Sequence, residues 1–197
     1  MFILAFTLLA AAFPLLSATL TQAERDAAIS DLQASRQHFL DSVAGLSPAQ
    51  WNFKPDENTW SVAECAEHIA VSEDVIFGLV QKALQAPAAP DKKSAVTDEF
   101  ILKAVVDRSQ KFKAPEVLRP THRFANPQET LAHFSESRDR TIEFVRSTQD
   151  DLRAHFMDHP VLKTMDAYQW VLLISAHSRR HTEQLLEVKA NPNFPAR

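Results

Sequence analysis

The sequence predicts an all-α protein built as a four-helix bundle. Two observations lead to this prediction: four stretches with apolar periodicity each begin with a helix-start signal, and glycine is rare. The chain has 197 residues but only two glycines, whereas a β-rich fold uses more glycine in its turns and bulges. The length fits one domain, and 45% apolar with 23% charged residues is ordinary globular usage.

Each start signal is a capping residue followed three positions later by Glu or Gln. In such a capping box the first side chain accepts a hydrogen bond from the third helical amide, and the Glu or Gln side chain reaches back. Pro127 adds a fixed φ at the first helical position of the third stretch. The four pairs are Thr21–Glu24, Ser61–Glu64, Asn126–Glu129 and Asp166–Gln169.

The first two helices are predicted at residues 22–43 and 62–84. The first has Ile29, Leu32, Phe39 and Val43 on one side. It ends at Gly45, because the Leu-Ser-Pro stretch at 46–48 cannot continue a helix. The second carries an apolar stripe and stops at the proline-containing stretch 87–90.

The other two helices are predicted at residues 127–148 and 167–190, the last ending before Pro192. The connection 85–125 is long for a bundle, and a short amphipathic helix at 98–106 is expected to occupy part of it. Long connections inside compact domains are usually crossovers or functional lids.

The N-terminal segment reads as an apolar leader at residues 1–18, ahead of a bundle domain at 20–197. The first 23 residues carry no charge, which is typical of a secretory signal. Cleavage near Ala18 is preferred, because a cut after Ala23 would remove the helix cap Thr21. The prediction is export to the periplasm or medium with no stable membrane association after cleavage; the alternatives are a cytoplasmic protein or an uncleaved anchor.

Charge and cysteine content exclude several classes of function. The net charge of −4 creates no field that attracts phosphate backbones, so no nucleic-acid partner is expected. Cys65 is the only cysteine, which excludes an internal disulfide and a Cys-rich zinc or iron–sulfur site.

His177 and His181 are the sharpest local feature of the sequence. At a spacing of four residues, two side chains project from one helix face, one turn apart, close enough to share a metal ion. Both follow the apolar period of the last helix, so the imidazoles should point into the bundle, where they need polar partners. The alternative is a pair of core histidines bonded to carboxylates.

His68 lies near the apolar stripe of the second helix, where a facing helix could bring it to the pair. Bundles commonly build metal sites from side chains on facing helices. Three neutral imidazoles leave at least one coordination position open, as in a catalytic site rather than a structural one. On its own, His68 would read as a satisfied core histidine.

Three stretches of the chain resemble the DinB-like superfamily. They are Trp-Ser-Val-Ala-Glu-Cys-Ala-Glu-His-Ile at 60–69, Ala-His-Ser-Arg-Arg-His-Thr-Glu-Gln at 176–184 and Leu-Ser-Pro-Ala-Gln-Trp at 46–51. The resemblance extends from about residue 20 to the C-terminus. It implies an up-down-down-up bundle with a long crossover between helices two and three, which fits the connection 85–125.

The resemblance also implies a ligand set and a chemistry. The three ligand histidines of the superfamily map onto His68, His177 and His181. The resemblance implies zinc or nickel as the expected metal, with iron or manganese as further options. The superfamily includes thiol-dependent transferases and isomerases, so the resemblance implies a small-molecule substrate, with a thiol among the candidates. A homodimer is compatible with it.

Other residues are weaker candidates for the site. Cys65, one turn before His68, could offer a thiolate to the same ion, but a small buried hydrophobic residue is the more ordinary interpretation. Glu64 is needed as a cap, and Glu67 could orient a ligand. The crossover is locally basic and could steer an anionic substrate or simply be solvated; its basic residues are Arg108, Lys111, Lys113, Arg119 and Arg123.

The remaining aromatic and histidine residues are assigned structural places. Trp51, Trp60 and Trp170 flank helix starts and are expected to seal the bundle ends. The histidines outside the triad are expected to have no ligand role, and three of them are read as surface residues in or beside loops: His122, His155 and His159.

Three functional hypotheses follow. The first is a divalent-metal-dependent hydrolase or transferase that uses an open three-histidine site. The second is a non-catalytic metal or small-ligand binding protein of the cell envelope. The third is a structural bundle with a vestigial triad.

Overall fold

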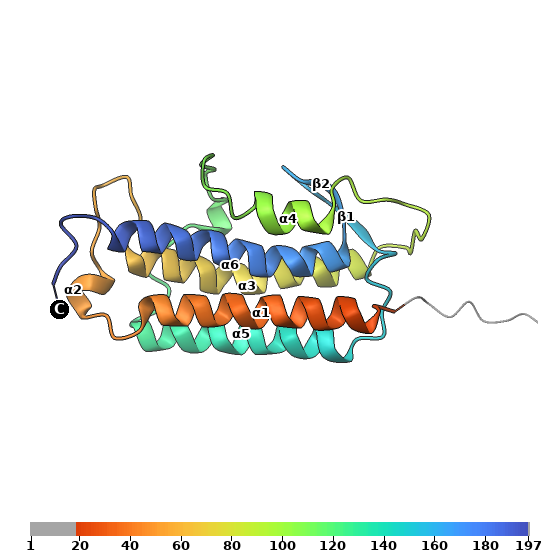
Figure 1. Ribbon diagram of the computed structural model, residues 1–197, viewed down its shortest axis with the longest axis horizontal. Coiled ribbons are helices and arrows are strands. Elements are labelled where there is room, and N and C mark those ends of the chain that lie inside the picture. The colour runs from red at the N-terminus through yellow and green to blue at the C-terminus, as the bar shows by residue number, and fades with distance from the viewer. Residues whose placement is uncertain (1–18, 197) are drawn as a thin grey trace, which may run out of the picture.

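The computed structural model describes residues 19–196, and its long helices form a bundle (Figure 1). The bundle helices are α1 (Gln22–Val43), α3 (Val62–Leu84), α5 (Pro127–Ser147) and α6 (Ala167–Lys189). Short helical segments stand between them: α2 (Pro48–Trp51), α4 (Asp98–Ala104) and the 3₁₀ turn η1 (Glu116–Leu118). A two-stranded antiparallel sheet pairs β1 (Phe156–His159) with β2 (Lys163–Asp166). The leader predicted at residues 1–18 lies outside the described residues.

The bundle has the expected up-down-down-up topology. The helices α1 and α6 run in one direction and α3 and α5 in the other (Figure 1). Each of α1 and α3 packs against both α5 and α6. The long crossover joins α3 to α5, the second and third bundle helices. The all-α fold class predicted from the sequence is therefore confirmed, and the predicted helix bounds agree within one or two residues.

The four start signals all cap helices, but only two are complete boxes. The side chains of Thr21 and Ser61 each accept a hydrogen bond from the third helical amide. In return, the carboxylates of Glu24 and Glu64 accept from the backbone amides of these two capping residues. Asn126 and Asp166 also accept from that amide. Their partners turn elsewhere: Glu129 accepts from the amide of residue 125, and the Gln169 side chain donates to the Val96 carbonyl and to Asp98.

The interior consists of two apolar clusters with a polar layer between them. One cluster includes Leu32, Ile76, Ile142 and Ile174, and the other includes Phe39, Ile69, Phe134 and Leu185. Between them lie Arg138 of α5, with an exposed fraction of 0%, and Glu73 of α3, with 1%. The two side chains form a bidentate ion pair with N–O distances of 2.6 and 2.7 Å.

This ion pair touches all four bundle helices. Arg138 also donates to the Leu32 carbonyl and the Ser35 hydroxyl of α1, and Ser178 of α6 donates to Glu73. Both charged groups of the ion pair therefore have hydrogen-bond partners, which is what makes a buried charge tolerable in a helical core.

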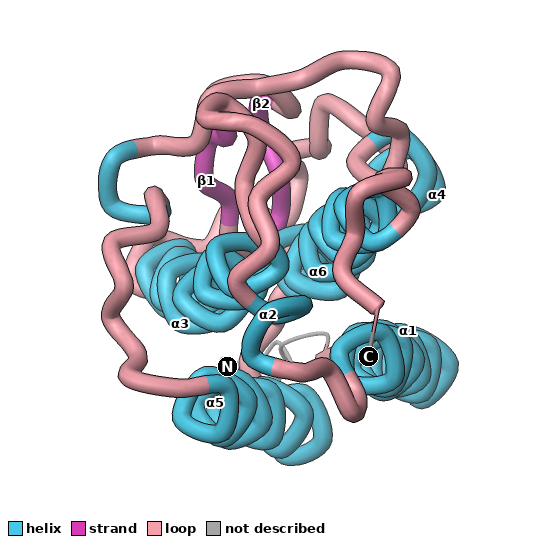
Figure 2. Tube along the Cα trace, turned by 90° about the vertical axis from the view of Figure 1, so that its left-hand side faces the viewer, coloured by secondary structure: helices cyan, strands magenta, loops and turns pink. Residues whose placement is uncertain are grey.

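The crossover and the β-hairpin cover the outer face of the α3–α6 pair (Figure 2). The hairpin was missed, because its strands have four residues each and no glycine marks their turn. Lys163 instead adopts the left-handed conformation, with φ of 64°, which an ordinary side chain rarely does. Periodicity arguments have little to detect in so short an element.

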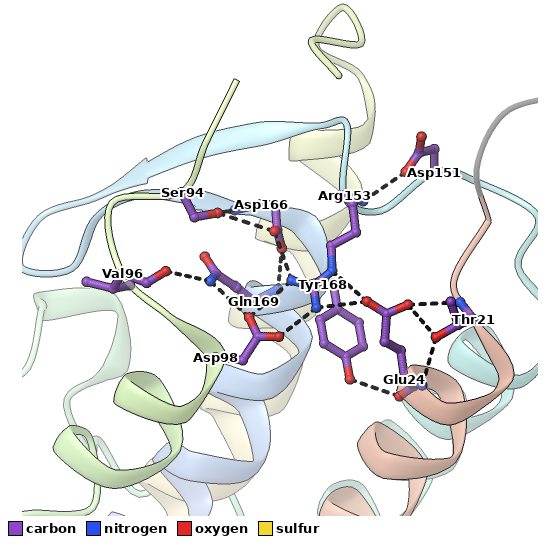
Figure 3. A network of polar contacts seen from close by, with 10 residues as sticks. All are labelled: Thr21, Glu24, Ser94, Val96, Asp98, Asp151, Arg153, Asp166, Tyr168 and Gln169. Carbon is purple, nitrogen blue, oxygen red and sulfur yellow. Dashed lines mark hydrogen bonds and ion pairs between the residues drawn. The ribbon is translucent and has the colours of Figure 1, made fainter. Parts of the chain in front are cut away.

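A second polar network fastens the start of the crossover to one end of the bundle (Figure 3). Arg153 binds Glu24 of α1, Asp98 of α4 and Asp166, the cap of α6. Its guanidinium also lies 4.1 Å from the centre of the Tyr168 ring. One arginine thus joins three elements that are distant in the sequence. Among the described residues, no helix is both long and apolar enough to cross a membrane.

Candidate metal centre

The three predicted histidines converge. The adjacent, antiparallel helices α3 and α6 bring His68 against His177 and His181, with ring centroids 4.2–5.0 Å apart. Each ring offers one nitrogen to a group whose members lie within 4.8 Å of one another. Within residues 19–196, these three histidines are close enough together to hold one metal ion.

Hydrogen bonds determine which nitrogens of two rings are free. The Nδ1 of His68 lies 2.8 Å from the Leu118 carbonyl oxygen in η1. A carbonyl can only accept, so the proton of the neutral ring is on Nδ1 and Nε2 carries a lone pair. The Nδ1 of His181 lies 2.8 Å from Gln184 Oε1, which leaves its Nε2 in the same state.

These two free Nε2 atoms face each other at 3.2 Å. Two lone pairs cannot hydrogen-bond to each other, so this arrangement has an unmet need for a cation or a proton. A tetrahedral ion with metal–nitrogen bonds of about 2.0–2.1 Å would hold two nitrogens about 3.3 Å apart. The donor set and its spacing therefore fit a divalent metal ion.

The environment keeps the rings in the neutral form that binds metal. Burial lowers the pKa of His177 well below its ordinary value of 6.5, and the nearby His181 and His68 lower it further. The same two causes, burial and a neighbouring imidazole, lower the pKa of His181. Burial also lowers the pKa of His68. Neutral imidazole is the form that ligates metal ions, so protons compete weakly here.

The triad lies at the seam between α3 and α6, not at the bundle centre. His68 is 2% exposed, whereas His177 and His181 are half-buried. Ser178, next to His177, is the residue that reaches the Arg138–Glu73 pair. Both α6 histidines face His68 of α3 at this seam. One turn of α6 therefore contributes side chains to two polar clusters, the histidine triad and the Arg138–Glu73 pair, on adjoining faces of the helix.

Trp60 is a site residue that sequence reasoning missed. Its ring centroid lies 4.9 Å from that of His68 and 6.2 Å from that of His181. Trp51 and Trp170, by contrast, are buried in the two apolar clusters, as expected for residues that close the bundle. The signal available for Trp60 was its place one residue before the Ser61 cap, at the helix end that carries His68.

Cys65 is a core residue. Its side chain is fully buried in an apolar cluster, and burial raises the pKa of its thiol. The more ordinary interpretation of the cysteine is thus supported. Glu64 caps α3 and binds Lys54, and Glu67 accepts from the amide of Thr121 in the crossover.

The histidines outside the triad have other partners. His38 pairs with Glu183 at 2.8 Å and His133 with Asp74 at 2.7 Å. His122 is exposed as predicted, but two assignments as surface residues were wrong, because His155 and His159 are half-buried. His155 lies within hydrogen-bonding distance of the carbonyl of residue 86, and His159 accepts from two amides in the hairpin turn.

The basic residues of the crossover mostly brace the chain. Arg108 makes a bidentate ion pair with Glu187 of α6, at 2.7 and 2.8 Å, and also donates to Gln184. Arg119 donates to the carbonyl of residue 114, and Arg123 to that of Val117. Arg119 and Arg123 therefore hold the crossover's own conformation, whereas Arg108 binds the crossover to α6.

Fold and site together define a helical-bundle protein with a candidate divalent-metal centre between two antiparallel helices. The chain belongs to the DinB superfamily, whose family profile matches residues 31–185. It is similar to the uncharacterized protein YuaE of Bacillus subtilis strain 168, with 26% identity over 155 residues that cover 79% of this chain and 93% of YuaE.

A solved structure supports the fold. YfiT from Bacillus subtilis is described as a probable metal-dependent hydrolase with an unusual four-helix bundle topology. It superposes with a TM-score of 0.56 at 15% identity, covering 87% of this chain and 89% of YfiT. At this identity the likeness shows the common fold.

Proposed function

We propose that the protein is a divalent-metal-dependent hydrolase or transferase that uses an open site formed by His68, His177 and His181. One observation carries the proposal: two Nε2 lone pairs face each other at 3.2 Å while both Nδ1 protons are engaged elsewhere. The superfamily assignment and the description of YfiT support the same chemistry. Zinc or nickel suits a set of imidazole donors, with iron or manganese as further options.

The residues at the site suggest how a reaction would be divided between protein and metal. A divalent ion bound there would lower the pKa of a nucleophile toward neutrality and polarise an electrophile. The three ligands are neutral, so the site keeps a net positive charge and favours an anionic ligand. In the described part of the chain no carboxylate hydrogen-bonds to the three rings.

A thiol, if one takes part, must come from a cosubstrate. Cys65 is buried among apolar side chains, and burial raises the pKa of its thiol. Thiol transfer would suit a cytoplasmic protein better than the exported one that we propose from the apolar leader, since low-molecular-weight thiols are scarcer outside the cytoplasm. Hydrolysis needs only water and suits either location. A small molecule is the proposed substrate in both cases.

The test combines metal analysis with activity. Protein purified after metal-replete growth is expected to carry stoichiometric metal, and His177→Ala to lose it together with any hydrolase or thiol-transfer activity. His133→Ala is the matched control, because His133 pairs with Asp74 away from the triad. Wild-type protein without stoichiometric metal would remove the site. Metal-loaded protein whose activity survives His177→Ala would favour a non-catalytic binding protein instead.

A further inference from the structure

Gln184 connects the candidate metal centre to the crossover. Its Oε1 atom lies 2.8 Å from the Nδ1 of His181 and 3.3 Å from the Nη1 of Arg108. Arg108 is itself fixed by a bidentate ion pair with Glu187, one turn further along α6. The chain of contacts therefore runs from a crossover residue through an amide to a metal-facing imidazole.

The orientation of this amide decides which nitrogen of His181 is free. A glutamine side chain can present either its oxygen or its NH₂ group to the ring. If the oxygen faces Nδ1, that nitrogen carries the proton and Nε2 keeps its lone pair toward His68. If the NH₂ group faces Nδ1, the neutral ring must place its proton on Nε2, where it blocks metal binding.

Arg108 selects between these two orientations. A guanidinium only donates hydrogen bonds, so it stabilises the amide with its oxygen toward Nη1 and disfavours the flipped amide, whose NH₂ group would meet another donor. The side chain of Arg108 is 14% exposed, so water competes little for this contact. His68 needs no such selector, because its partner is a backbone carbonyl.

We propose that Arg108 and Gln184 are positioning residues that hold His181 in the tautomer with a free Nε2. The proposal rests on the proposed metal-dependent function for its purpose, but the tautomer itself is a property of the metal-free protein. It gives the crossover a role beyond connecting two helices, since one of its side chains keeps a ligand of the metal centre competent.

Nitrogen-15 NMR of histidine-labelled, metal-free protein tests the proposal directly, because protonated and unprotonated ring nitrogens differ in chemical shift. In the wild type, His181 is expected to be protonated at Nδ1. Arg108→Met should shift the population toward protonation at Nε2. Adding Gln184→Glu to that variant should restore protonation at Nδ1, because a carboxylate presents oxygen in either orientation.

Two controls separate this role from general loosening. The tautomer of His68 should stay the same in every variant, which shows that the site remains folded. Arg123→Met removes another crossover arginine, which donates to the carbonyl of Val117 and does not contact Gln184, and should leave the tautomer of His181 unchanged. An Nε2-protonated His181 in the wild type, or no response to Arg108→Met, would overturn the proposal.

Zinc affinity, measured by competition with a chelator, gives a second readout with a diagnostic sign. Loss of an outer partner of a ligating histidine typically weakens metal binding by about 10- to 100-fold, and that range is expected for Arg108→Met, with recovery when Gln184→Glu is added. If Arg108 acted only through its charge, its removal would strengthen binding of a cation. A protein that shows the expected tautomers but binds no metal would refute the proposed function and leave the orienting role intact.

Discussion

Two polar clusters adjoin each other along α6 in this bundle and differ in whether their hydrogen-bonding groups are satisfied. In the Arg138–Glu73 cluster each donor meets an acceptor, and the charges of opposite sign cancel. In the histidine cluster two acceptors face each other. The first cluster is complete without any addition, whereas the second requires a cation or a proton.

The position of each cluster matches this difference. The ion pair is at the centre of the four helices, where solvent cannot reach and unmet polar groups are costly. The triad is at the α3–α6 seam beneath the crossover, where His177 and His181 are less completely buried than Arg138 and Glu73. A polar cluster whose hydrogen-bonding groups are all satisfied can hold the helices together in the core. A cluster with unsatisfied lone pairs can bind a ligand only where the ligand can reach it from solvent.

Breaking the Arg138–Glu73 cluster should have the largest effect on the free energy of unfolding. Arg138→Met leaves the buried carboxylate of Glu73 without its counter-charge, and loss of one partner of a buried pair typically costs about 3–5 kcal/mol. Urea unfolding should show this loss both with and without metal, since the pair does not take part in the triad.

A double variant makes this prediction falsifiable even if Arg138→Met fails to fold. Combining it with Glu73→Met removes both charges, so the double variant should be more stable than either single one. Losses that simply add would show that the two side chains do not act as a pair.

Breaking the histidine triad should affect the stability of the protein only when metal is present. An ion that binds the native state at 100 times its dissociation constant adds about 2.7 kcal/mol, which corresponds to about 5–10 °C in melting temperature for a chain of this size. His181→Ala should lose most of that increment and leave the metal-free protein nearly unchanged. Equal losses with and without metal would show that His181 acts by packing.

The sequence predicted the helices well because their signals are local. Capping pairs and apolar periodicity depend on a few consecutive residues, and they located the four long helices to within one or two positions. The histidine triad was also within reach, because the spacing of His177 and His181 is local and the resemblance to a family supplied His68. The structure brings these three residues together.

The polar layer was missed although a signal existed. Arg138 falls between Phe134 and Ile142 on the apolar stripe of its helix, and Glu73 lies between Ile69 and Ile76. Two opposite charges on inward stripes of different helices indicate a buried ion pair. The contacts of Leu118 with His68 and of Arg108 with Gln184 could not be predicted in this way, because they depend on how the crossover folds over the seam.

The smallest predicted effect is a pH dependence of the metal-free protein. The pKa values of His177 and His181 are lowered by burial and by their mutual proximity, so the unfolded chain binds protons more readily than the folded one. The stabilising contribution of the neutral rings is therefore fully present above about pH 6.5, the ordinary histidine pKa, and declines as the pH falls below it.

Urea unfolding between pH 7.5 and about 5, above the range where most carboxylates titrate, should show this decline in the metal-free wild type. The slope should be smaller in His177→Ala, which removes one shifted ring and the repulsion it exerts on the others. An equal slope in both proteins would place the titrating groups outside the triad.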